Sequence, residues 1–221
     1  SVLCKGRLVP HQYGCSGIDG IALGPQFGKT KGKQFLQVDV AIYGDTTRND
    51  NDYQLLLQFD PVKIEKFALP LDQAHPHHSG PQHAAQRFFV YTGNTSYGIQ
   101  NLEYDPASHN WFAAVYPGHK RQFHNFQLFA IDGTRKPVKQ ILKSGRPEKA
   151  RVLSLAPIGC QGYQEGIYGW DFNLGSTGIA ALGDGLFYIS RNGTTRQGHQ
   201  FCDLRLYRWT GNAEMPFEEL K

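Results

Sequence analysis

The sequence is poor in charged residues and has no long apolar run, and these shortages exclude several classes of protein. Charged residues are 19% of the 221-residue chain, whereas Gly, Phe and Tyr number 25, 14 and 11. A helix bundle needs more Ala, Glu, Lys and Leu, and a disordered chain has fewer aromatic residues. No segment approaches the roughly 18 consecutive apolar residues of a membrane-spanning helix, so no membrane partner is expected.

Several familiar site motifs are also missing. The chain has no CxxC pair, no HExxH pair, no GxSxG elbow and no GxxxxGK[ST] phosphate loop. These absences argue against a structural zinc site, a zinc protease, an α/β-hydrolase and a P-loop nucleotide site. The formal net charge is only +4 and the Lys and Arg residues are scattered, so no nucleic-acid partner is expected either.

The cysteine count and two glycosylation sequons bear on the compartment. An even number of cysteines permits two disulfides, which suit an exported protein, and free buried thiols are the alternative. The four residues are Cys4, Cys15, Cys160 and Cys202. Asn94-Thr95-Ser96 and Asn192-Gly193-Thr194 match the N-glycosylation pattern. Together these features favour a secreted or periplasmic protein.

The apolar pattern is strand-like nearly throughout, with alternation of period two over 35–43, and it predicts an all-β fold. The runs are short, rich in β-branched and aromatic residues, and bounded by Gly, Pro, Asn or Asp. No twelve-residue stretch keeps a helical period without a breaker. The predicted strands are 35–43, 53–59, 87–93, 111–116, 126–132, 152–159, 185–190 and 203–209.

A Gly-Ile pair recurs three times at nearly constant spacing. Gly17-Ile18, Gly98-Ile99 and Gly178-Ile179 are 81 and 80 residues apart. An aromatic-rich strand, a polar loop and a third strand follow each pair. The predicted fourth strands are 65–71, 138–143 and 216–220, and the predicted upstream strands are 2–8, 87–93 and 150–156. Each unit is therefore expected to be an antiparallel meander with an additional strand.

The phrases LEYDPASHNWFAAVY (102–116) and LGDGLFYIS (182–190) place a strand, a tight turn and an aromatic strand in order. With the Gly-Ile turns, they give the chain a resemblance to a β-propeller that covers almost its whole length. The resemblance implies one domain over 1–221, with pseudo-repeats at approximately 1–72, 73–143 and 144–221. Three large blades and five small blades both fit, and a β-sandwich with coincidental repeats is the alternative.

Two further expectations follow from the repeat. The three Gly-Ile turns should superpose. Inter-sheet packing should bury the aromatic residues Phe35, Trp111, Phe112, Tyr116, Phe187 and Tyr188.

The resemblance also implies where a ligand would bind, because the turns leading into the innermost strands of a propeller converge at one mouth. Asp19 is one candidate, because Gln100 and Ala180 stand at its repeat-equivalent positions and the fold does not require a carboxylate there. Gln100 and Asn101 offer amide donors and acceptors to sugar hydroxyls. Trp170 offers an indole that can stack on a sugar ring. This divergence among repeats predicts one composite site.

Two loops supply further candidates. Residues 73–83 hold four of the nine histidines, and His78 is predicted to act as acid or base with Asp19, with His11 as an alternative base. The loop Asp45–Asp52 has three carboxylates and two amides, which could hold Ca²⁺ or simply form a solvated turn. Its Arg48 could bind an acidic sugar group. No other cofactor is expected.

These observations predict an extracellular carbohydrate-binding or carbohydrate-active protein whose partner is a glycan or small-molecule ligand. As an enzyme it would be a glycoside hydrolase or a polysaccharide lyase. The alternative is a protein-interaction scaffold or a lectin, and a scaffold requires an exposed apolar patch.

Overall fold

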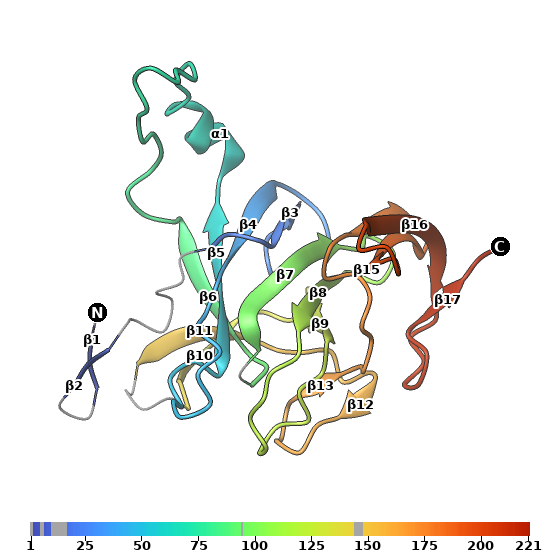
Figure 1. The fold of residues 1–221 in the computed structure, drawn as a ribbon. Helices are drawn as coiled ribbons and strands as arrows, with labels where there is room; N and C mark the ends of the chain where they lie inside the picture. Colours follow the sequence, from blue (N-terminus) through green and yellow to red (C-terminus); the bar gives the residue numbers. More distant parts are fainter. Residues whose placement is uncertain (1, 5–6, 10–16, 94, 144–147) are drawn as a thin grey trace.

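The structure is a computed structural model, and it describes the chain outside residues 1, 5–6, 10–16, 94 and 144–147 (Figure 1). The described residues form an all-β fold built on three main sheets. The one helix among them, α1 (Pro61–Glu65), has five residues, far fewer than a membrane crossing requires. Two small hairpins complete the fold: β1 (Val2–Cys4) with β2 (Arg7–Val9), and β12 (Cys160–Gln161) with β13 (Tyr168–Gly169).

The first main sheet has six strands in the order β10-β11-β6-β5-β4-β3. All neighbours are antiparallel except β11 and β6, which are parallel and pair over only two residues, Val152 with Phe89 and Leu153 with Val90. The strands are β3 (Ile21–Pro25), β4 (Gln34–Val40), β5 (Tyr53–Phe59), β6 (Gln86–Tyr91), β10 (Val138–Ile141) and β11 (Lys149–Leu153).

The other two main sheets are antiparallel meanders. The three-stranded sheet contains β7 (Ser96–Tyr104), β8 (Asn110–Tyr116) and β9 (Leu128–Asp132). The four-stranded sheet contains β14 (Ile179–Gly183), β15 (Leu186–Thr194), β16 (Gln200–Trp209) and β17 (Phe217–Glu219).

The three-stranded sheet lies between the other two and is buried on both faces (Figure 1). Because side chains alternate along a strand, Trp111 and Ala113 of β8 pack with the six-stranded sheet, whereas Phe112 and Ala114 pack with the four-stranded sheet. This explains why β8 reads as a continuous apolar run. The described sheets form a face-to-face stack and do not close into a ring.

Most predicted strands are confirmed, but two of the three predicted fourth strands are placed differently. Residues 65–71 contain the end of α1 and a loop, because the Asp60-Pro61 pair starts a helical turn and Pro70 cannot join a ladder. The strand within 138–143 exists as β10 but pairs with β11 in the six-stranded sheet. The third, at 216–220, is confirmed as β17.

The pseudo-repeat boundaries and the sheets divide the chain differently. The boundary expected between residues 72 and 73 falls between β5 and β6, which pair over six residues in one sheet. The predicted upstream strands 87–93 and 150–156 also lie in this sheet, as β6 and β11.

The aromatic core was predicted in part. Trp111, Phe112 and Phe187 are fully buried between sheets, and Phe35 is half-buried. The prediction is wrong for Tyr116 and Tyr188, which are 41% and 42% exposed. Tyr116 is the last residue of β8. Tyr188 alternates with the buried Phe187 and Ile189, so it lies on the outer face of the four-stranded sheet.

Gly17 and Gly178 precede the first strands of their sheets, whereas Gly98 is the third residue of β7. Gly98 has a φ of 86°, and Gly178 does not adopt a positive φ. These two turns therefore differ in backbone conformation, and the superposition of all three stays a prediction.

Candidate functional site

Three of the predicted site residues meet where the first strands of neighbouring sheets adjoin. Gln100 Nε2 lies 3.5 Å from Asp19 Oδ2, which links β7 to the segment before β3. Asn101 Nδ2 donates a 2.6 Å hydrogen bond to the Ser176 carbonyl, which links β7 to the segment before β14. The Asn101 amide is thus bound by the backbone, whereas the contact between Gln100 and Asp19 is long and exposed.

A buried carboxyl group lies beneath this junction. Asp39 of β4 is fully buried, and its Oδ2 accepts a 3.0 Å hydrogen bond from the Ile99 N–H of β7. Burial raises the pKa of Asp39 well above its usual range, and the nearby carboxylate of Asp19 raises it further. Its Oδ1 has no hydrogen-bond partner within the described chain.

Trp170 occupies a different position from the predicted one. Its side chain is only 1% exposed, and its indole N–H donates a 2.8 Å hydrogen bond to the Asn212 carbonyl. Its ring packs edge-to-face on Trp209 at 5.3 Å between centroids. With both the ring and the N–H engaged in the core, Trp170 presents no face on which a sugar could stack.

His78 lies in the exposed segment 66–85, which follows α1 and projects from the six-stranded sheet (Figure 1). Asp19 lies two residues before Ile21, which pairs with Val38 of β4 in the same sheet. The joint role of Asp19 and His78 in catalysis stays a prediction. His11 lies outside the described residues.

The acidic loop at 45–52 is occupied by the protein's own groups. The Asp45 carboxylate accepts bonds from the Thr47 N–H and hydroxyl at 2.8 and 2.7 Å. Both oxygens of Asp50 bind the Arg48 guanidinium at 2.8 Å. In the part of the chain that the structure describes, no group of three His, Cys, Asp or Glu residues is arranged to hold a metal. Neither a Ca²⁺ site nor an Arg48 anion site is supported here.

Lys120 accounts for the third carboxylate of this loop. Its side chain is fully buried, and its ammonium donates to the Arg48 carbonyl, to Asn51 Oδ1 at 2.8 Å and to a carboxylate oxygen of Asp52. These three bonds use all three ammonium hydrogens. Asn51 Nδ2 in turn donates to the carbonyls of Tyr43 and Asp45 at 2.8 and 2.9 Å. The loop is thus fixed to the segment that follows β8.

An open pocket of about 450 Å³ lies directly beside this network. We call it the tyrosine pocket, and its lining residues are Tyr43, Gly44, Asp45, Ser96, Tyr97, Tyr116, Pro117 and His119. The three tyrosines come from three separate segments, and their side chains are 40%, 57% and 41% exposed in chain order. Exposed phenol rings grouped around a concave surface are typical of a binding site.

The backbone at this pocket is strained. Tyr97 has a φ of 64°, which a bulky L-residue rarely adopts, and Gly98 follows with a φ of 86°. These two residues form a β-bulge, because the register of β7 against β8 shifts between Ser96 and Ile99. Bulges commonly redirect side chains next to functional sites, and here the bulge coincides with the exposure of Tyr97.

The sequence singled out two of the segments that contribute to this pocket, 45–52 and 94–101, but the other contributing residues lie outside both. Tyr43, Tyr116 and His119 were not identified, because nothing in the pattern shows that the end of β8 meets the end of β4. Lys120 carries no sequence signal at all, since most lysines are exposed.

The two cysteines whose side chains are described fit neither of the two alternatives, paired cysteines or buried free thiols. Cys160 and Cys202 are exposed free thiols. Cys15 and the side chain of Cys4 lie outside the described residues.

Comparisons with protein-family models, with curated proteins and with solved structures found no match, so function is argued from the site alone.

Proposed function

We propose that this chain binds a carbohydrate in the tyrosine pocket. The observation that carries the proposal is the grouping of Tyr43, Tyr97 and Tyr116 around one open pocket. Phenol rings present flat apolar faces with a polar tip, which suits the alternating apolar faces and hydroxyl edges of sugars. His119 and the Ser96 hydroxyl add polar groups that can orient a ligand.

The network behind the pocket supports binding by a pre-formed site. Lys120 and Asn51 fix the loop that carries Tyr43 and Asp45, and Ser96 Oγ donates a 3.1 Å hydrogen bond to the Pro117 carbonyl. A site whose walls are already ordered loses less conformational entropy when the ligand binds. Asp45 is the one carboxylate among the lining residues and already binds Thr47, so we propose binding rather than cleavage.

A glycan array followed by calorimetric titration tests this proposal. Tyr97→Ala should weaken binding of the best glycan at least about tenfold, which corresponds to ~1.4 kcal/mol. Tyr163→Ala removes another exposed tyrosine, one that lies outside the pocket, and should leave the affinity unchanged. Silence on every glycan, or equal losses in both variants, would contradict the proposal.

We further propose that the stacked sheets are arranged as propeller blades. The support is that each sheet contains an antiparallel meander in chain order and that each packs face-to-face on the next. A crystal structure of the chain tests it. One rotation axis should relate each sheet to the next, with β3, β7 and β14 nearest that axis, and unrelated rotations would rule it out.

We propose that the protein is exported from the cytoplasm, because the sequon residue Asn192 lies exposed on β15, where it could be glycosylated. Mass spectrometry of the protein from its native source should find it in the extracellular or periplasmic fraction, and a cytosolic location would contradict this.

A second candidate function, a protein-interaction scaffold, is favoured by the outer face of the four-stranded sheet. Leu182, Tyr188 and Leu204 are exposed there, at 50%, 42% and 63%. The other sheets of this chain pack through such faces, so the occupant we propose is the same face of a second copy. Light scattering should then show a dimer that Leu204→Lys converts to a monomer, and a wild-type monomer at high concentration would exclude it.

A further inference from the structure

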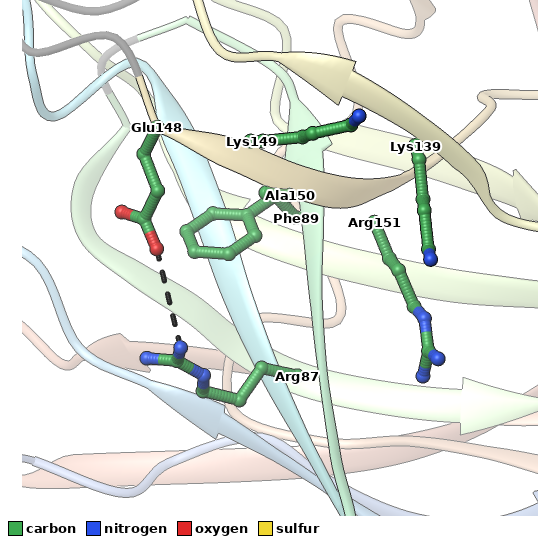
Figure 2. Close-up of a pocket in the computed structure, with 7 residues that line it drawn as sticks. All are labelled: Arg87, Phe89, Lys139, Glu148, Lys149, Ala150 and Arg151. Carbon is green, nitrogen blue, oxygen red and sulfur yellow. Dashed lines mark ion pairs between the residues drawn. The ribbon is translucent and has the colours of Figure 1, made fainter.

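A second pocket lies in the six-stranded sheet where β6 and β11 diverge. These parallel strands pair only at Val152–Phe89 and Leu153–Val90, and toward Arg87 and Lys149 they separate. The opening has a volume of about 380 Å³, and the Phe89 ring lies at its centre, as Figure 2 shows. We call it the basic pocket, because Arg87, Lys139, Lys149 and Arg151 line it.

The charges around this pocket are not balanced. Lys139 of β10 and Arg151 of β11 are directly opposite each other in the register, and like charges in that position destabilise a sheet. Figure 2 shows both side chains extending to the same side of Phe89. Glu148 is the one carboxylate among the lining residues, and it faces Arg87 at 4.0 Å. An unfavourable pair of this kind suggests that an external anion completes the site.

Another pocket, of about 300 Å³, lies on the opposite face of the sheet and adjoins the first through Arg151, which lines both. It adds Lys29, Lys136 and the amides of Gln26 and Gln86. The six cations of the two pockets less one carboxylate give a formal charge of +5. The whole chain carries +4, so the remaining residues sum to −1 and have no excess of positive charge.

We propose that this edge binds an anionic polysaccharide, such as a sulfated or uronic acid chain, across both pockets. Spacing of the cations over two adjoining pockets suits a ligand with repeated charges better than a single small anion. The Gln26 amide and the NH2 group of Gln86 can bind sugar hydroxyls between the charged groups, whereas Gln86 Oε1 accepts a hydrogen bond from Arg151.

Nucleic acid fits this surface less well. The aromatic residues in the two pockets, Phe27, Phe88 and Phe89, are at most 5% exposed and offer no platform for stacked bases. In the part of the chain that the structure describes, neither pocket is lined by a helix that could enter a major groove.

The site is separate from the tyrosine pocket. Arg87 pairs with Leu57 toward one end of β5. Tyr53 begins the other end of β5 and directly follows the loop 45–52, which carries Asp45 and the residues that Lys120 binds. The inference therefore does not depend on the proposed carbohydrate site at the tyrosines.

Binding to heparin oligosaccharides at several salt concentrations tests the proposal on the full chain. The wild type should bind with an affinity that falls steeply with salt, because ligand binding releases counterions. Lys139→Gln/Arg151→Gln should lose at least tenfold in affinity at low salt and show a shallower salt dependence. The matched control Arg196→Gln/Arg208→Gln removes the same charge from exposed positions in the turn between β15 and β16 and in β16, and it should bind like wild type.

Three results would overturn the proposal. They are no heparin binding by the wild type at low salt, equal losses in the two double variants, and tighter binding of a single-stranded DNA of matched charge than of heparin. Circular dichroism should give both variants the wild-type spectrum. Lys139→Gln alone should raise the melting temperature, because it removes one member of the like-charged pair.

Discussion

Asp39 shows how one buried side chain can make the stability of this protein depend on pH. Burial raises its folded-state pKa above the unfolded value of about 3.9, so the unfolded chain releases this proton first as the pH rises. The folded state then binds more protons than the unfolded state. The contribution of Asp39 to the free energy of unfolding therefore falls from about pH 4 upward, until the pH passes the folded-state pKa.

Asp39→Asn should remove this decline. The asparagine Oδ1 can still accept the hydrogen bond from Ile99, and its amide nitrogen then takes the place of Asp39 Oδ1, which has no partner in the described chain. Urea denaturation from pH 4 to 8 should show the variant gaining stability relative to wild type as the pH rises. A constant difference would show that folding does not raise the pKa of Asp39.

Lys120 is the residue whose loss should cost most near the tyrosine pocket. Lys120→Met would leave the Asp52 carboxylate buried without its cation, which typically destabilises a protein by about 3–5 kcal/mol. Chemical denaturation measures the loss. The double variant Lys120→Met/Asp52→Asn should recover part of it, and a single variant as stable as wild type would contradict the buried network.

At the scale of elements, the position of a strand in the stack decides which of its residues are costly to truncate. Trp111 and Phe112 of β8 face opposite sheets and are both fully buried, whereas in β15 Phe187 is buried and Tyr188 faces outward. Ala substitutions at Trp111, Phe112 and Phe187 should each cost about 3–5 kcal/mol. Tyr188→Ala should change stability by less than about 1 kcal/mol. A large loss at Tyr188 would mean that its face is covered in solution.

Strand positions were predictable from the sequence because short apolar runs, turn residues and aromatic content agree locally, as at Tyr53–Phe59. Strand partners were less predictable. Residues 138–141 have the composition of a strand, but nothing local indicates that they pair with β11 beside β6. Sheet membership depends on contacts between residues distant in sequence, which a repeat pattern only partly constrains.

The candidate site was predictable only as segments. Asp19, Gln100 and Asn101 were expected together and do lie along one junction, yet Asn101 binds a backbone carbonyl rather than facing an open cavity. Trp170 was expected to be exposed because it lies in a glycine-rich loop, but the three-stranded and four-stranded sheets bury it between them. Exposure is set by packing of whole sheets, so composition could not distinguish these cases.

At the scale of the whole molecule, the six-stranded sheet separates two surfaces of different chemistry. The tyrosine pocket lies toward the Tyr53 end of β5, and the basic pocket lies toward its Phe59 end, beside Arg87. The first combines aromatic rings with few charges, and the second combines cations with little exposed aromatic surface. Two such surfaces on one rigid stack would allow the protein to bind two parts of a glycan, or two different glycans.

A double-mutant cycle at the tyrosine pocket tests the central claim most directly. Calorimetry with the best-binding glycan would compare wild type, Tyr97→Ala, Tyr116→Ala and the double variant. Two rings that contact one ligand in one pocket should each cost at least about 1 kcal/mol and show a coupling energy of at least ~0.5 kcal/mol. Wild-type affinity in both single variants, with all four proteins equally folded, would contradict a carbohydrate site at the tyrosine pocket.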